Sequence, residues 1–210
     1  MSLSKGFWKG KYMKISYHKT LSVLIAITAI LTIHSTTFAF GSKEKTPEEQ
    51  AAEKDKKATE SYNEGVKHMD KAKAIAGKGD STYAFTYRAT SDAKAQKEYE
   101  KAAKSFTTAV ELKPNFPESW NNLGFTYRKL NKLAQSLEAY QKALELKPGF
   151  PEAHEYLGET YLALDSLHLA QGQLQMLQEL KSPYADTLLK SIEIYKLSKV
   201  NDKLNGSKKN

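Results

Sequence analysis

The residue types that most often carry out chemistry are sparse in this sequence. Cysteine is absent, which excludes disulfides, thiolate metal sites and cysteine nucleophiles. No two histidines have the spacing of a zinc-binding pair; the five histidines are His18, His34, His68, His154 and His168. No nucleophile, base and acid form a recognisable pattern. The sequence therefore predicts a protein that is not an enzyme and that holds no metal or cofactor.

One short glycine-rich stretch, GKGDST at residues 77–82, resembles a phosphate-binding loop. That loop needs a further glycine five residues before its Gly-Lys pair, where the backbone turns around the phosphates. Ala72 occupies this position, within a segment of helical periodicity. We therefore interpret the stretch as the end of a helix.

Recognition of a peptide is a chemistry that the sequence does support. Asn121, Phe125 and Arg128 are four and three residues apart, so in a helix they share one face. An amide, an aromatic ring and a guanidinium on one face are anchors of the kind that hold peptides. Phe125 could equally pack against a neighbouring helix, and the sequence leaves both interpretations open.

The formal charge of +8 is concentrated at the N-terminus. Residues 1–39 contain five lysines and no acidic residue, which leaves 27 basic against 24 acidic residues in the rest of the chain. Because those remaining charges are interspersed, they are typical of solvated helical faces and not of a nucleic-acid interface. The sequence therefore predicts no nucleic-acid partner.

Residues 1–39 have the pattern of a signal peptide. A basic stretch precedes the apolar run 21–33, and a small-x-small cleavage site ends at Ala39. Met13 opens a compact signal sequence of its own and is an alternative start of translation. If the segment is not cleaved, residues 21–40 are long enough to anchor the chain in a membrane. We expect an exported, periplasmic protein, with a membrane-anchored protein as the alternative.

Apolar residues recur at steps of three and four along most of the remaining chain, which predicts helices. Residues 40–57 form a polar linker that also contains a helix start, TPEE at 46–49. Residues 77–90 lack the periodicity, and their aromatic residues are predicted either to fold back on the first helices or to contact a partner. Residues 201–210 are expected to form a disordered tail. The later helices are expected at about 117–130, 133–146, 151–164, 167–180 and 184–200.

Two segments of the chain repeat each other at a distance of 34 residues. KPNFPESWNNLGFTYRKL at 113–130 recurs as KPGFPEAHEYLGETYLAL at 147–164. The residues of 117–150 that match a known repeat signature are Trp120, Leu123, Gly124, Tyr127, Ser136, Tyr140, Ala143 and Pro148. This unit resembles a tetratricopeptide repeat. The copy that follows departs from the signature, since His154 stands at the tryptophan position and Leu174 at the aromatic one.

The resemblance implies an all-α fold: a right-handed superhelix of about three antiparallel helical hairpins with a C-terminal capping helix. Residues 183–200 are expected to cap the array. The first repeat is expected to contain an insertion of roughly 25 residues, because Gly65 and Ala102 are 37 residues apart where a regular repeat has 12 between these positions. The expected repeats span residues 58–182 and are 58–116 with the insertion at 77–90, 117–150 and 151–182.

Stacked repeats of this family turn the first helix of each hairpin to a concave side, where peptides bind. The resemblance therefore implies a partner-binding groove at equivalent positions of the three first helices. These positions are Tyr62, Val66, Met69, Asn121, Phe125, Arg128, Glu155, Glu159 and Leu162. Family members that bind C-terminal carboxylates use lysine, arginine and asparagine here. This chain has mostly aromatic, aliphatic and acidic residues, which predicts another mode of binding.

These observations together predict a non-catalytic scaffold of the bacterial cell envelope that binds a protein or peptide. The alternative is a membrane-anchored accessory subunit of an envelope enzyme or assembly complex.

Overall fold

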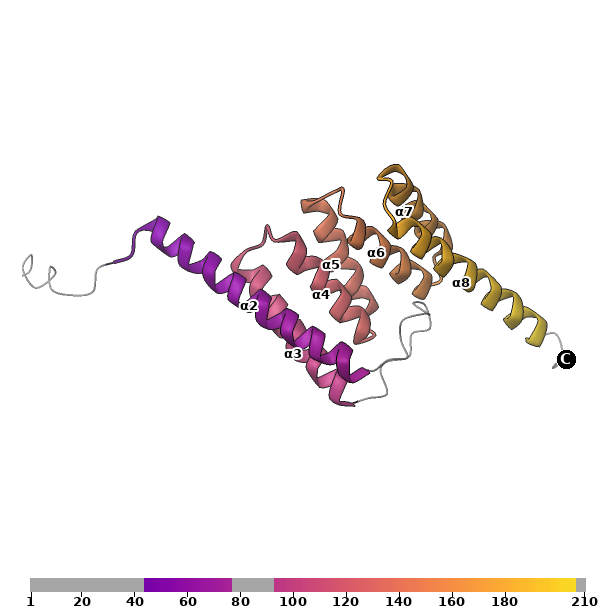
Figure 1. The fold of residues 1–210 in the computed structure, drawn as a ribbon, viewed down its shortest axis with the longest axis horizontal. Coiled ribbons are helices and arrows are strands. Elements are labelled where there is room, and N and C mark those ends of the chain that lie inside the picture. Colours follow the sequence, from indigo (N-terminus) through magenta and orange to yellow (C-terminus); the bar gives the residue numbers. More distant parts are fainter. Residues whose placement is uncertain (1–43, 77–92, 207–210) are drawn as a thin grey trace, which may run out of the picture. The chain divides into compact units, whose positions relative to one another are not determined.

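The computed structural model describes residues 44–76 and 93–206, and all the helices in these ranges belong to one compact unit, Pro47–Asn210. In chain order the helices are α2 (Pro47–Ala76), α3 (Ala93–Leu112), α4 (Pro117–Lys129), α5 (Leu133–Leu146), α6 (Pro151–Ala163), α7 (Leu167–Glu179) and α8 (Tyr184–Gly206) (Figure 1). The predicted signal peptide at 1–39 and the predicted loop at 77–90 lie outside the described residues. None of the described helices combines the length and the apolar composition that a membrane span requires.

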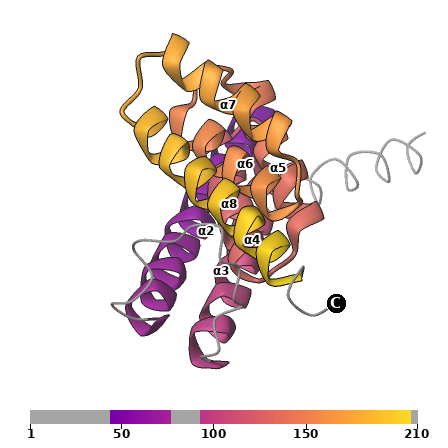
Figure 2. The same cartoon turned by 90° about the vertical axis from the view of Figure 1, so that its right-hand side faces the viewer.

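The helices pair into hairpins: α2 packs with α3, α4 with α5, and α6 with α7. Each hairpin packs on the next, because the second helix of one contacts the first helix of the following one, α3 on α4 and α5 on α6 (Figure 1). Helix α8 contacts both α6 and α7 and covers the last hairpin (Figure 2). The predicted all-α array of three hairpins with a C-terminal helix is confirmed.

The turns inside the second and third hairpins are built alike. Asn131 and Asp165 have φ angles of 57° and 60°, a left-handed conformation that Asn and Asp adopt more readily than other non-glycine residues. The amide N–H groups of Lys132 and Ser166 then donate to carbonyl oxygens five residues earlier, at 2.9 Å and 2.8 Å. This bond pattern ends a helix and reverses the chain within three residues.

Close contact within the first two hairpins depends on a glycine of the first helix. A methyl group at Gly65 would lie 2.7 Å from ring carbons of Phe106, and one at Gly124 would lie 2.7 Å from ring carbons of Tyr140. In each case the ring of the second helix lies directly on the backbone of the first. Glycine is therefore required at both positions by the distance between the helices, as the repeat pattern implies.

The third hairpin uses a residue from α8 instead. A methyl group at Gly158 would lie 2.5 Å from the side chain of Leu188. Leu174, the α7 residue at the aromatic position, is only partly buried beside the cluster that Leu188 joins. Helix α8 thus contacts the face of α6 that an aromatic ring of the second helix would cover in a regular repeat.

Helix α8 continues to Gly206, so the prediction of a disordered tail from residue 201 is wrong for residues 201–206. The Nζ of Lys199 lies 2.5 Å from a carboxylate oxygen of Asp165, and the Tyr195 hydroxyl donates to the same carboxylate. These contacts hold α8 against the turn of the third hairpin up to Lys199. Residues 200–205, which follow, include no proline or glycine, so the helix can propagate through them.

The insertion in the first repeat lengthens both of its helices. Helix α2 continues eleven residues beyond Gly65, from 65 to 76, whereas α4 continues only five beyond Gly124, from 124 to 129. Helix α3 begins thirteen residues before Phe106, at 93, whereas α5 begins seven before Tyr140, at 133. Six extra residues in each helix, almost two turns, therefore extend the first hairpin.

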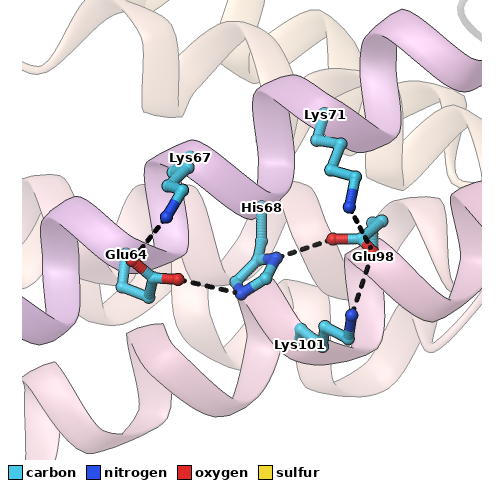
Figure 3. A network of polar contacts seen from close by, with 6 residues as sticks. All are labelled: Glu64, Lys67, His68, Lys71, Glu98 and Lys101. Carbon is cyan, nitrogen blue, oxygen red and sulfur yellow. Dashed lines mark hydrogen bonds and ion pairs between the residues drawn. The ribbon is translucent and has the colours of Figure 1, made fainter.

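A polar network joins the two helices of this longer hairpin (Figure 3). The Nδ1 of His68 on α2 lies 2.6 Å from a Glu98 oxygen on α3, and its Nε2 lies 3.2 Å from Glu64. Lys71 and Lys101 donate to the other Glu98 oxygen at 3.1 Å and 3.0 Å. The hydrogen bond with His68, followed by that with Lys101, lowers the pKa of Glu98 to about 2. The carboxylate of Glu98 thus stays ionised and links α2 to α3.

Candidate partner-binding site

The three predicted groove residues of α2 pack inside the first hairpin and against α4. The ring centroids of Tyr62 and Phe116 are 4.8 Å apart. The Tyr62 hydroxyl accepts a hydrogen bond from the side-chain amide of Asn122 at 3.3 Å. Met69 is buried in the main core, and Val66 packs against that core. These side chains therefore take part in packing between helices.

Phe125 lies at the centre of the contacts made by α4. Its ring centroid is 6.4 Å from that of Tyr99 on α3 and 5.5 Å from that of Tyr156 on α6. The Nζ of Lys73, in the added turns of α2, lies 4.9 Å from the same ring, within the range of a cation–π contact. Phe125 has 9% of its surface exposed and is packed between helices. Packing was one of the two interpretations that the sequence left open, and binding was the other.

Arg128 connects α4 to α6. Its Nη1 lies 2.5 Å from Oε2 of Glu159, and both side chains are almost fully buried. Its guanidinium carbon also lies 5.6 Å from the Phe125 ring centroid and 5.3 Å from that of Tyr156. On the other side, Ser191 of α8 donates to Glu159 at 3.5 Å. The buried ion pair therefore has its charge compensated and is held from three helices.

Glu155, one turn before Glu159 on α6, has no such compensation. It is 5% exposed and makes no hydrogen bond or ion pair with any residue that the structure describes. Burial, and secondarily the charge of Glu159, raises the pKa of Glu155 from 4.5 to about 8, although Arg128 opposes the shift. At neutral pH this carboxyl is therefore mostly protonated in the folded protein.

Asn121 is a second buried polar group with unmet hydrogen-bonding capacity. The residue is 6% exposed, and its Oδ1 accepts no hydrogen bond within the described part of the chain. A buried amide oxygen without a donor is uncommon in folded proteins. The Oδ1 of Asn121 is therefore an acceptor that the described residues leave unsatisfied.

Leu162 does not belong with these residues. It is 2% exposed and lies in a separate apolar cluster with Leu177 and Leu188. The sequence places it at a groove position because α6 repeats α4, but α8 packs where a further repeat would stand. We therefore define the α4–α6 face without it, as Asn121, Phe125, Arg128, Glu155 and Glu159.

Several residues that contact this face were not predicted from the sequence to lie beside it, among them Tyr156 and Lys73. Tyr156 forms ring contacts with Phe125, and Lys73 places its ammonium group beside the same ring. Tyr156 has the spacing of a packing residue, and Lys73 stands in a helical extension that the regular repeat lacks. No local pattern distinguishes either of them from its neighbours.

His154 has a structural role that its position in the repeat explains. The indole N–H of Trp120 donates to the carbonyl of Pro114 at 2.8 Å, and Nε2 of His154 makes the equivalent bond to Pro148 at 2.8 Å. Its Nδ1 lies 2.7 Å from the side-chain amide of Gln173. Because a carbonyl only accepts, Nε2 carries a proton, and His154 replaces tryptophan as a hydrogen-bond donor. Among the described residues no group of three potential ligands is placed to hold a metal ion.

Comparison with known families agrees with this geometry. Residues 117–150, which form α4, α5 and the following turn, match the model described as "Tetratricopeptide repeat". Residues 94–131, which form α3 and α4, match a second model described as "TPR repeat". Residues 94–150 therefore match tetratricopeptide repeats. No curated protein matches the sequence.

Similar solved structures include repeat proteins of this kind. The crystal structure of MamA has a TM-score of 0.39 and 24% identity over 40% of this chain, and the match covers 49% of the MamA chain. The NMR structure of the first TPR domain of human RPAP3 has a TM-score of 0.45 and 25% identity, covering 50% of this chain and 85% of that one. The first TPR of Spaghetti (RPAP3), bound to the HSP90 peptide SRMEEVD, has a TM-score of 0.46 and 19% identity, covering 63% and 92%.

Proposed function

We propose that this protein is a non-catalytic scaffold that binds a protein or peptide through the α4–α6 face of its tetratricopeptide repeats. One observation carries the proposal. Polar groups with incomplete partners lie beside aromatic rings on the two successive first helices, the helices that bind ligands in this repeat family. Asn121 has an unsatisfied acceptor and Glu155 an uncompensated carboxyl. Such groups are costly in a face that serves packing alone.

Affinity capture with the full chain as bait tests the proposal. The bait is compared with the variant Phe125→Ala, Arg128→Ala and with a control, Leu177→Ala, which removes a buried side chain from the cluster beneath α8. Circular dichroism first establishes a temperature at which all three are folded. We expect the partner to be lost from the α4–α6 variant and kept by the control. Undiminished capture by the α4–α6 variant would rule the proposal out.

We propose further that the scaffold works outside the cytosol, in the bacterial cell envelope, because the sequence of residues 1–39 has the pattern of a signal peptide. Fractionation of cells, with mass spectrometry of the N-terminus, tests this. A periplasmic chain that begins after Ala39 is the expected result. A chain that stays in the membrane after alkaline carbonate extraction indicates the anchored alternative, and a cytosolic chain contradicts both.

A further inference from the structure

We propose that the C-terminal end of α8 binds the surface of an anionic lipid membrane, with three apolar side chains in the lipid and lysines at the phosphate groups. The last turns of α8 extend beyond α6 and α7 (Figure 1). Leu197, Val200 and Leu204 are 65%, 53% and 57% exposed, more than any other large apolar side chain of the described residues. We call these three side chains the outer stripe. It is separate from the α4–α6 face, so the inference goes beyond the proposed function.

Helix α8 has apolar side chains on two different sides. Leu188, Ile192 and Tyr195 face the array and are buried in its last apolar cluster. Because each residue turns a helix by about 100°, the outer stripe lies roughly opposite Tyr195. The side that faces the array continues beyond Tyr195 with two charged residues, Lys199 and Asp202. The outer stripe is therefore no extension of the buried cluster and needs an apolar environment of its own.

The charge around the outer stripe is positive. Residues 196–209 contain one acidic residue, Asp202, and five lysines. These lysines are Lys196, Lys199, Lys203, Lys208 and Lys209. Two further acids are close: Asp165 pairs with Lys199, and Glu193 precedes Leu197 by one turn and ends the stripe there. The lysines still outnumber the acids when all three acids are counted.

An exposed apolar stripe with flanking lysines is typical of a helix that lies in the plane of a membrane surface. The apolar side chains enter the boundary between the head groups and the acyl chains, and each lysine close to the surface is attracted by anionic lipid. None of the described helices has the length and apolar composition of a membrane span. The contact that we propose is therefore one of attachment at the surface.

A second copy of this chain fits the outer stripe less well than lipid does. A stable protein interface buries about 800 Å² on each partner and uses about 20–30 residues of each. Three side chains at the end of a helix provide only a small part of that area. Two copies would also bring two lysine-rich segments together, and these repel each other.

A fluorescent label beside the outer stripe tests the proposal in the full chain. The sequence has no cysteine, so Asn201→Cys provides a single thiol for an NBD label at an exposed position of α8. The labelled chain is titrated with vesicles of phosphatidylglycerol and phosphatidylcholine in equal amounts, and with vesicles of phosphatidylcholine alone. We expect brighter, blue-shifted emission with the anionic vesicles only. Raising the salt from about 0.1 M to about 1 M should weaken binding, because the charges are then screened.

Two substitutions, each read with the Asn201 label, separate the apolar contribution from the ionic one. Leu197→Gln should weaken vesicle binding about tenfold, as transfer of the exposed part of one leucine from water predicts. Lys196→Gln should weaken it about fivefold, as expected for one lysine at an anionic surface. The matched controls, Leu169→Gln on α7 and Lys104→Gln on α3, change exposed residues outside the stripe and should leave binding unchanged.

A second label position checks that α8 makes the contact. The same label on Glu138→Cys, an exposed position of α5, should show no change with either kind of vesicle. Equal responses of the Asn201 label to both kinds of vesicle, or no response to either, would overturn the inference. Equal binding by Leu197→Gln and Leu169→Gln would also overturn it.

Sedimentation without lipid tests the alternative of a second copy. We expect the full chain and Leu197→Gln to have the same oligomeric state. A dimer of the full chain that Leu197→Gln fails to form would show that a second copy covers the stripe, and would overturn the inference. A captured protein that is lost from Leu197→Gln, but kept by the variant Phe125→Ala, Arg128→Ala, would overturn it in favour of a protein ligand. Capture through the α4–α6 face uses other residues, so either proposal can fail alone.

Discussion

At the scale of single residues, the buried polar groups of the α4–α6 face differ in whether they have a hydrogen-bond or ion-pair partner. Arg128 and Glu159 compensate each other, whereas Glu155 is equally buried without a partner among the described residues. Glu155 and Glu159 are one turn apart on α6, yet Glu159 is paired with a cation and Glu155 is not. This difference, and not the acidic residue type, makes Glu155 the residue to test.

Glu155 should make the stability of the protein depend on pH. Between about pH 4.5 and about pH 8 the carboxyl is protonated in the folded state and ionised in the unfolded chain. The folded state then binds more protons, so the free energy of unfolding falls as pH rises through this window and levels off above it. Urea denaturation at about pH 5 and about pH 8 measures the fall.

The variant Glu155→Gln is neutral at both pH values and should largely remove this fall in stability. Glu98 does not interfere, because its lowered pKa confines its own effect to pH values below 4.5. Wild-type and variant curves with the same pH dependence between the two values would contradict the assignment to Glu155.

At the scale of the helices, the distance between paired helices is set by glycine against an aromatic ring. Gly65 faces Phe106, and Gly124 faces Tyr140, although the first hairpin is longer than the second. The added turns of the first hairpin therefore lie beyond the glycine–ring contact, which both hairpins share. Lys73, which lies in the added turns of α2, also reaches Phe125. The insertion thus changes the environment of the face without changing how the hairpin is packed.

Gly124→Ala and Gly172→Ala form a matched pair that tests this packing. At Gly124 the methyl group would lie 2.7 Å from the Tyr140 ring, so we expect a loss of about 1–3 kcal/mol in the free energy of unfolding. Gly172, inside α7, has nothing within 4 Å of that position, so its substitution should stabilise the helix by about 0.5–1 kcal/mol. Thermal and urea unfolding measure both. Equal effects of the two substitutions would show that the ring contact does not limit the helix spacing.

At the scale of the whole repeat array, α8 completes the last hairpin. Leu188 and Ile192 form one apolar cluster with Leu177 of α7 and Leu162 of α6. A repeat array is held together by contacts between neighbours, so its end needs a helix that covers the open apolar face. Helix α8 serves this purpose and also contributes Ser191 to the buried ion pair.

A chain that ends at Ser182 should lose protection from hydrogen exchange first in α6 and α7, because removal of α8 exposes their shared apolar cluster. Helices α2 and α3 make no contact with α8 and should keep their protection. Hydrogen exchange followed by mass spectrometry measures both regions. Uniform loss of protection along the whole array would show that α8 stabilises more than the hairpin it touches.

The sequence by itself determined the helices and their pairing into hairpins. The 34-residue period, the prolines that begin α4 and α6, and the small residue opposite each ring are local signals, and the structure confirms the elements that they predict. The face was determined only in part. Asn121, Phe125 and Arg128 share one side of α4, as their spacing requires.

Only the tertiary structure decided how each of the predicted groove residues is packed and paired. The 34-residue period describes the residues that the repeats share. The α4–α6 face depends instead on the places where this chain departs from the regular repeat. The added turns of α2 bring Lys73 to Phe125, and α8 takes Leu162 into the core and contacts Glu159. The raised pKa of Glu155 was not predictable from the sequence either, because it depends on burial by chain segments that are distant in sequence.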